Sequence, residues 1–183
     1  MLINIIGVPT SGKSTLMRSL LSRFGEGVEL EPMKLFKCTV FGDILVLGRY
    51  PAGETFGGTD KLSYGCIPKF KEFITKAVKD YEHIIFEGDR FGTANLIEFL
   101  LDEMSEKTEV RVFVLLLSDM EEEHKRHKLR DDNQSEAWLK GRRTLIDNLL
   151  MNLMLMGRLD ERYNDNMESS KKIEQEIYGL LQK

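Results

Sequence analysis

The chain has 183 residues, of which 42% are hydrophobic and 31% are charged, and its formal net charge at pH 7 is −4. This length suits one domain with a sizeable core, and the composition excludes a disordered or membrane-embedded chain. The acidic balance argues against a protein whose whole surface coats nucleic acid, although a local basic groove is compatible with it.

Cysteine content and the first residues of the chain predict a cytoplasmic protein. Cys38 and Cys66 are too few and too isolated for a disulfide framework or a zinc site. The apolar run 2–6 has no basic leader and reaches glycine at position 7, which is typical of a strand rather than a signal peptide. No apolar run approaches the length of a membrane span, so we expect no membrane partner.

Apolar runs and amphipathic stretches alternate along the chain. Short apolar runs between turn signals are typical of strands, and apolar residues spaced three and four apart are typical of helices. The expected strands are residues 2–6, 35–40, 44–47, 83–86 and 110–117, with a weaker candidate at 159–165. The expected helices are residues 14–24, 67–81, 93–104 and 135–156, with two more that begin near residues 119 and 169.

This order of elements predicts an α/β fold. Residues 35–40 and 44–47 flank a short turn and are expected to form a hairpin. The other strands are uninterrupted apolar runs separated by helices, which predicts a parallel sheet covered on both faces, in three layers. We expect one domain over residues 1–183, because no linker or repeat divides the chain.

The segment GVPTSGKST predicts a phosphate-binding loop. It fits G-x-x-x-x-G-K-[ST] and stands between an apolar strand and a helix, which is the context that this motif needs. Main-chain N–H groups and the helix N-terminus would hold the anion, Lys13 would reach the β- and γ-phosphates, and the Ser14 hydroxyl would bind Mg²⁺. The predicted nucleotide-binding residues are Gly7, Pro9, Thr10, Ser11, Gly12, Lys13, Ser14 and Thr15.

The remaining sequence favours a kinase over other proteins with this loop. No N/T-K-x-D segment of the GTPase type is present, and motor ATPases generally need more chain. A small P-loop domain with a charged helix pair after its fourth strand resembles nucleotide-kinase-type phosphotransferases. The resemblance implies a P-loop NTPase topology with a helical lid, and ATP and Mg²⁺ as cofactors. No base-contact motif separates ATP from GTP.

Two carboxylates follow the strand 83–86 in the segment HIIFEGDRFG. Strand ends of an open α/β sheet face the ligand crevice, so Glu87 and Asp89 are candidates for the metal ligand and for the base that accepts the acceptor's proton. Arg90 is a candidate for binding an anionic substrate group. Glu87 matches the strand-end glutamate of deoxynucleoside kinases, and Asp89-Arg90-Phe91 resembles the D-R-[YFH] of thymidylate kinases, which lack the preceding Glu-Gly. The sequence does not settle which acid has which role.

Basic residues gather in the predicted lid, residues 119–143. Arginines on a moving segment stabilise the charge that develops during phosphoryl transfer. Arg126, Arg130 and Arg143 are the candidates for this role. A solvated helix face with i,i+4 ion pairs is the alternative for any one of them.

The glycine-rich segment 48–63 occupies the position where such kinases bind their acceptor. Its candidate substrate residues are Arg49, Tyr50, Phe56, Asp60 and Lys61. Residues 48–63, 87–91 and 133–142 are together similar to phage P-loop kinases. That resemblance implies transfer to the hydroxymethyl group of 5-hydroxymethyluracil in DNA, with the base flipped out of the stack, in the cytoplasm of a bacteriophage host.

Two other functions fit the same sequence. The acceptor could be a free nucleoside, a nucleoside monophosphate or another small metabolite, or the chain could be a nucleotide-binding module without transfer activity. The paired acids at Glu87 and Asp89 speak against the second. The apolar stretch 145–156 is either core or a subunit contact of a homodimer, and Trp138 is expected to pack rather than to bind a base.

Overall fold

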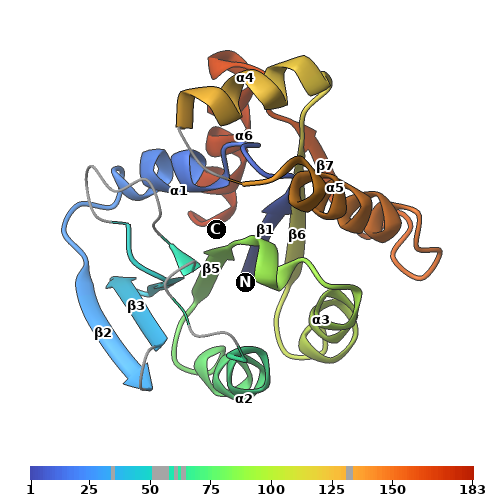
Figure 1. The fold of residues 1–183 in the computed structure, drawn as a ribbon. Helices are drawn as coiled ribbons and strands as arrows, with labels where there is room; N and C mark the ends of the chain where they lie inside the picture. Colours follow the sequence, from blue (N-terminus) through green and yellow to red (C-terminus); the bar gives the residue numbers. More distant parts are fainter. Residues whose placement is uncertain (34–35, 51–57, 60–61, 63–64, 131–133) are drawn as a thin grey trace.

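A computed structural model describes residues 1–33, 36–50, 58–59, 62, 65–130 and 134–183, and the side chain of Arg130 is outside the description (Figure 1). The described strands form one sheet in the order β2-β3-β4-β5-β1-β6-β7. Their bounds are β1 Leu2–Gly7, β2 Val28–Met33, β3 Phe36–Phe41, β4 Ile44–Leu47, β5 His83–Glu87, β6 Val110–Leu116 and β7 Asp160–Tyr163.

Strand β1 is the centre of the parallel part of the sheet. It pairs in parallel with β5 and β6, and β4 and β7 extend this arrangement on either side. Every residue of β1 is buried, as expected for a strand covered on both faces. The predicted parallel sheet is confirmed, including the weak candidate at 159–165, and the predicted hairpin is β3–β4 with a two-residue turn at Gly42-Asp43.

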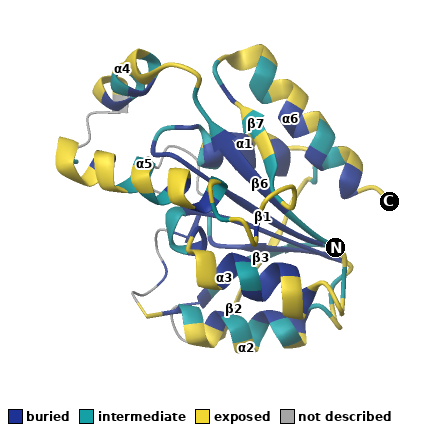
Figure 2. Cartoon of the chain, turned by 90° about the vertical axis from the view of Figure 1, so that its right-hand side faces the viewer, coloured by how far each residue is buried: buried dark blue, intermediate teal, exposed yellow. Residues whose placement is uncertain are grey.

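Helices cover both faces of the sheet, so the predicted three layers are confirmed (Figure 1). Helices α2 (Ile67–Ala77) and α3 (Ala94–Phe99, continued by the π-helical residues Leu100–Met104) lie on one face. Helices α1 (Lys13–Leu21) and α6 (Met167–Leu180) lie on the other. Figure 2 shows the buried strands between helices whose outer sides are exposed. Within the described ranges, no helix has the length and apolar character needed to cross a bilayer.

Helix α6 packs along α1 and completes the hydrophobic core between these two helices and the sheet. Ile173 and Ile177 join Leu16 and Leu20 in this core. The Glu174 carboxylate, which is buried, accepts hydrogen bonds from Ser19 of α1 and from Arg23, two residues after α1 ends. Apolar burial and a hydrogen-bonded ion pair therefore fix the two helices together.

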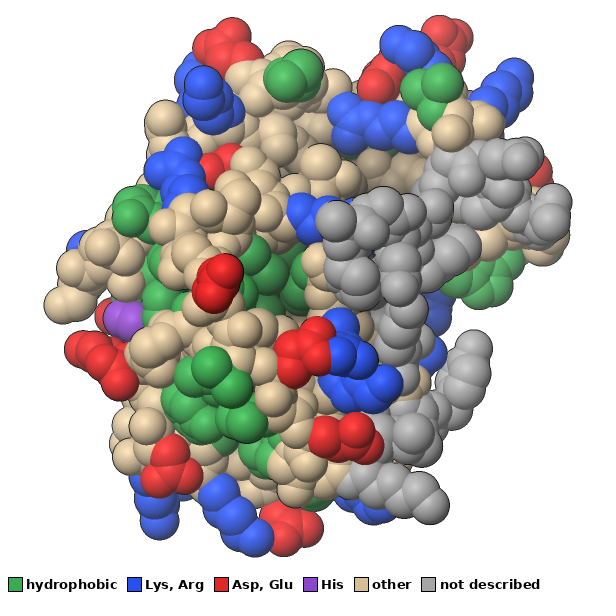
Figure 3. All heavy atoms as spheres, turned by 90° about the vertical axis from the view of Figure 1, so that its left-hand side faces the viewer, with side chains coloured by type: hydrophobic (Ala, Val, Ile, Leu, Met, Phe, Trp, Pro, Cys, Tyr) green, Lys and Arg blue, Asp and Glu red, His purple; other side chains and the backbone are tan. Residues whose placement is uncertain are grey.

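Strand β2 was not predicted from the sequence. It pairs antiparallel with β3 at the edge of the sheet, and its first five residues are exposed. Figure 3 looks onto the side of the molecule where β2 lies and shows apolar side chains among charged ones there. Val28 and Leu30 are among the exposed apolar residues. A Pro and two Glu in the strand interrupt the apolar pattern, as is common for edge strands.

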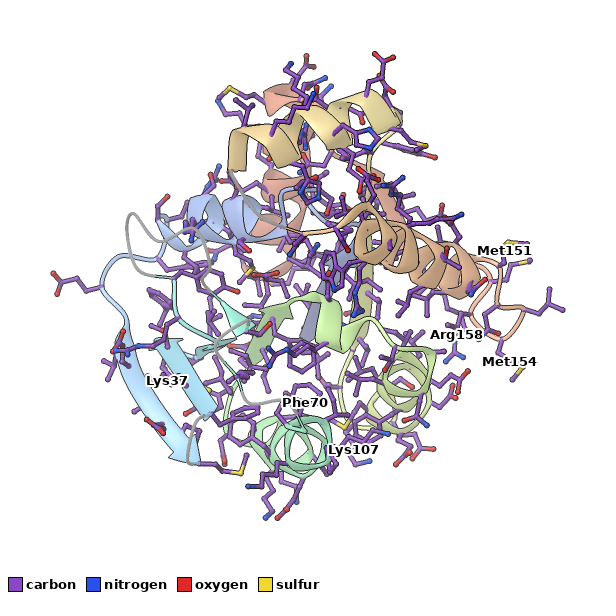
Figure 4. All side chains as sticks on the ribbon, viewed as in Figure 1. Lys37, Phe70, Lys107, Met151, Met154 and Arg158 are labelled. Carbon is purple, nitrogen blue, oxygen red and sulfur yellow. The ribbon has the colours of Figure 1, made fainter. Side chains whose placement is uncertain are left out.

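Helix α5 (Glu136–Leu150) is shorter than the predicted 135–156. The side chain of Asn152 accepts a hydrogen bond from the Met154 N–H and so starts a turn, and Arg158 donates to the Leu101 carbonyl at 2.8 Å. The apolar side chains of this turn, Met151 and Met154 among them, point away from the protein (Figure 4). The predicted helix end at residue 156 is therefore wrong, and a homodimer contact through residues 145–156 stays a prediction.

Candidate active site

The candidate active site lies where the parallel strands end. Strand β1 leads into the loop 7–14, β5 ends at Glu87, and β7 is followed by the buried Asn164. Carboxyl ends of parallel strands meet at one edge of a sheet, which is the ligand side of open α/β folds. The alternation of strands and helices thus brings together residues that are far apart in the chain.

The loop 7–14 has the backbone that an anion-binding nest requires. Gly12 caps α1 with a φ of 87°, and Thr10 has a φ of 58°. The first N–H groups of α1 have no partner within the helix and carry its partial positive charge. The Lys13 ammonium lies 3.0 Å from the Gly7 carbonyl oxygen and 2.9 Å from that of Val8. The buried Thr10 hydroxyl has no hydrogen-bond partner among the described residues, so this loop fits a polyphosphate with its Mg²⁺.

Both predicted carboxylates contact this loop. The Ser14 hydroxyl donates to Glu87 Oε1 at 2.9 Å, and Lys13 Nζ lies 3.5 Å from Asp89 Oδ1. The Glu87 side chain is buried, whereas Asp89 is partly exposed. The structure therefore places two acids beside the two loop residues that are predicted to bind phosphate and Mg²⁺.

The backbone at 88–91 is held so that both acids face the loop. Gly88 has a φ of 137°, and a Cβ there would lie 2.3 Å from the Thr59 hydroxyl oxygen. Only glycine combines this dihedral with this close approach. The Asn4 side chain donates to the Phe91 carbonyl at 3.1 Å and so anchors the short 3₁₀ turn η2 (Asp89–Phe91). Sequence reasoning missed Asn4, although it is the one polar residue in the apolar run 2–6.

The predicted acceptor segment returns to the same acid. Within it, the backbones of Arg49 and Gly58 pair, and the Tyr50 hydroxyl donates to Glu87 Oε1 at 3.4 Å. The Thr59 hydroxyl donates to the Glu87 carbonyl. The Arg49 side chain turns outward and pairs with Glu29 of β2. Phe56, Asp60 and Lys61 are outside the described residues.

The described contacts of Arg90 are with Leu62 and Cys66. Its guanidinium donates to the Leu62 carbonyl, and it lies close enough to Cys66 to oppose the rise in the pKa of that thiol that burial causes. Arg90 therefore connects η2 to Leu62 of the acceptor segment, and its binding of an anionic substrate group stays a prediction.

The predicted lid consists of α4 (Met120–Arg130) and α5. Arg143 lies between these helices, 3.3 Å from Glu123 Oε2 and 3.6 Å from Glu136 Oε2. Burial raises the pKa of Glu123, and Arg143 opposes that shift. Arg126 donates to main-chain carbonyls, and the Arg130 side chain is not described. Both arginines are thus held by contacts within the fold, and their part in phosphoryl transfer stays a prediction.

Among the lid arginines whose side chains the structure describes, Arg142 is the one that reaches Asp89. Its Nε lies 3.8 Å from Asp89 Oδ2, and its guanidinium lies over the Trp138 ring at 5.5 Å from the centroid. Arg142 and Asp89 line one small cavity with Gly7. The sequence held a signal for this contact. Arg142 lies on the same side of α5 as the buried residues Ile146 and Leu149. Arg143 is rotated about the helix axis by about 100° from Arg142.

Two comparisons with known proteins bear on this site. A family model described as P-loop Nucleotide Kinase3 matches residues 1–166, which contain the loop, both acids and the predicted lid. A search of curated proteins gave no match.

Proposed function

Because the chain belongs to the P-loop Nucleotide Kinase3 family, we propose that it transfers the γ-phosphate of ATP to a hydroxyl group. The observation that carries the proposal is the pair of contacts between Ser14 and Glu87 and between Lys13 and Asp89. A module that only binds a nucleotide needs the loop and one acid for its Mg²⁺, so the second acid favours transfer.

Glu87 is the better candidate for the base. Its carboxylate oxygen is within hydrogen-bond distance of Tyr50, which comes from the acceptor segment, and of Ser14, which comes from the phosphate loop. An acceptor hydroxyl between those two elements would be within reach of Glu87, which could accept its proton as the new O–P bond forms.

Asp89 has a positioning role in this proposal. It lies between Lys13 and Arg142, and so it holds two cations near the place where the phosphate charge develops. Ser14 would supply a hydroxyl ligand to Mg²⁺, and Glu87 or Asp89 would hold the ion through water. When bound, Mg²⁺ neutralises charge on the β- and γ-phosphates.

The proposed acceptor is 5-hydroxymethyluracil in DNA, as the resemblance to phage kinases implies. Trp138 supports an aromatic acceptor. The ring is 40% exposed, and it stands one helical turn from Arg142 on the side of α5 that reaches Asp89. A half-exposed ring beside an arginine suits stacking of an extruded base.

One experiment tests the reaction and the acceptor together. The protein is incubated with γ-labelled ATP, Mg²⁺ and one of four acceptors: DNA with 5-hydroxymethyluracil, unmodified DNA, the free nucleoside, or its monophosphate. We expect label on the modified DNA, with strong inhibition by salt. Lys13→Ala should abolish transfer, and Glu87→Gln should lower kcat by about 10²–10⁴-fold. Lys76→Ala, at an exposed lysine of α2, is the matched control and should keep full activity.

The outcomes separate the alternatives. Label on free nucleosides alone would discard the DNA acceptor and keep the kinase. ADP binding without transfer to any acceptor would favour a binding module. Full turnover by Glu87→Gln would overturn the assignment of the base.

A further inference from the structure

The side of the phosphate loop that faces away from its N–H groups is held by a buried asparagine. Asn164 follows β7 and is 3% exposed, and its side-chain nitrogen donates to the Ser11 carbonyl at 2.6 Å. Its own N–H donates to the Leu116 carbonyl at 2.9 Å, so the residue is fixed to β6. A Cβ on Gly12 would lie 2.6 Å from the Asn164 side-chain nitrogen. The second glycine of the loop motif is thus needed here for space as well as for its dihedral.

This contact sets the direction of one N–H group. In a trans peptide unit the C=O and the N–H point in opposite directions. Because the Ser11 carbonyl points at Asn164, the Gly12 N–H points to the opposite side of the loop. That N–H adjoins the first turn of α1, where phosphate oxygens bind in loops of this kind. Without Asn164, this peptide unit would lose the hydrogen bond that prevents it from flipping.

Arg126 of α4 acts on the same stretch. Its guanidinium donates to the Asn164 carbonyl at 3.0 Å, to the Asp165 carbonyl at 2.6 Å and to the Thr10 carbonyl at 3.4 Å. The Glu122 carboxylate accepts from Arg126 Nε at 2.8 Å and keeps the guanidinium in place. The first helix of the predicted lid is therefore connected to the phosphate loop through main-chain carbonyls.

We propose that Asn164 and Arg126 form a carbonyl clamp, a pair of positioning residues that orients the 10–12 peptides of the loop for polyphosphate binding. This inference rests on the proposed function for its ligand, and it assigns Arg126 to binding rather than to the transition state. Asn164 lies 150 residues beyond the loop in sequence, and no motif in the chain marked it.

The test measures binding without turnover. Calorimetry gives the affinities of the wild type, Asn164→Ala, Asn164→Asp and Arg126→Ala for Mg·ADP and for tripolyphosphate, which has no base. We expect Asn164→Ala to weaken both ligands by about tenfold, as the loss of one buried hydrogen bond implies. Asn164→Asp keeps the shape but loses the donor and adds a charge, so it should weaken both ligands at least as much. Arg126→Ala should weaken both by about five- to tenfold.

A matched control separates binding from stability. Asn152→Ala removes a comparable side-chain hydrogen bond, to Glu98, at a distance from the loop. It should leave both affinities unchanged, even if all the variants lower the melting temperature alike.

Three other outcomes would overturn the clamp in whole or in part, and one would leave it standing. Loss of Mg·ADP affinity with tripolyphosphate affinity intact would mean that Asn164 contacts the base. An Arg126→Ala variant with unchanged affinities and a lower kcat would make Arg126 a transition-state residue. A wild type that binds both ligands but transfers no phosphate would remove the kinase proposal and keep the clamp. A wild type that binds neither would remove both.

Discussion

At the scale of single residues, the space around Glu87 is set by glycines. A Cβ on Gly58 would lie 2.6 Å from Glu87 Oε1 and 2.9 Å from the Tyr50 hydroxyl. Gly58 also has a φ of 67°, which disfavours any other residue. The acid that we propose as base is therefore positioned partly by the absence of a side chain opposite it.

We expect Gly58→Ala to lower kcat by about 10²-fold, because displacing a reacting group by about 1 Å has an effect of that size. Nucleotide affinity should change little, because the loop 7–14 is not touched. Gly25→Ala is the matched control, since Gly25 has a φ of 78° and open space around its Cβ position. Steady-state kinetics give kcat for both variants. Equal decreases in kcat would show that backbone strain, rather than the contact with Glu87, is responsible.

The meeting of Lys13, Ser14, Glu87 and Asp89 was predictable from sequence, whereas the choice among the lid arginines had only the weaker signal of the apolar stripe of α5. The first follows from one rule, that parallel strands end at the same edge of the sheet. The second depends on how α4 and α5 rotate about their axes, and one residue of sequence moves a side chain by about 100°. Asn164 could not be found because its role arises only from its contact with a loop at the other end of the chain.

At the scale of elements, α4 and α5 meet through a buried acid. Glu123 of α4 faces Arg143 of α5, with His124 and His127 from its own helix and Glu136 from α5 nearby. Burial raises its pKa above the ordinary value of 4.5. The folded state therefore favours the protonated form, so the contribution of Glu123 to stability is complete below pH 4.5 and is lost as the pH rises through the folded-state pKa.

We expect the free energy of unfolding of the wild type to fall, relative to that of Glu123→Gln, as the pH rises from about 4 to about 8. Urea unfolding at a series of pH values measures the difference. Glu121→Gln makes the same change at an exposed position of α4 and corrects for the loss of one charge. Parallel curves for the wild type and Glu123→Gln would contradict the prediction.

Most elements followed from periodicity, and the two errors have physical causes. Most residues of strand β2 are exposed, so its sequence has no apolar pattern that would predict a strand. The strand forms because its backbone pairs with β3. The end of α5 is set by Asn152 and by Arg158, which binds the π-helical segment after α3. The local sequence 145–156 has no Gly or Pro to announce that end.

At the scale of the whole molecule, an aromatic cluster joins the site to the hydrophobic core between the sheet and helices α2 and α3. Phe70 of α2 is fully buried and lies 5.0 Å from Phe86 of β5 and 4.7 Å from Phe91 of η2, between ring centroids. Figure 4 shows Phe70 on the side of α2 that faces the sheet. The turn that carries Asp89 therefore rests on this cluster.

We expect Phe70→Ala to lower the free energy of unfolding by about 3–5 kcal/mol, because it removes a ring from a packed core and leaves a cavity. Phe73→Ala, at a partly buried position of the same helix, should lower it less. Denaturant unfolding compares the two variants. A loss below about 1 kcal/mol for Phe70→Ala would show that the core closes around the gap.

Helix α6 packs on α1 although it lies outside the residues that the family model matches. The family model ends at residue 166, one residue before α6 begins, yet Ile173, Ile177 and Leu180 fill the core beneath the helix that starts at Lys13. We expect a chain that ends at residue 166 to expose the apolar side of α1 to solvent and to leave Arg23 without the Glu174 carboxylate. The part of the chain that the family model matches therefore stops short of the residues that complete this core.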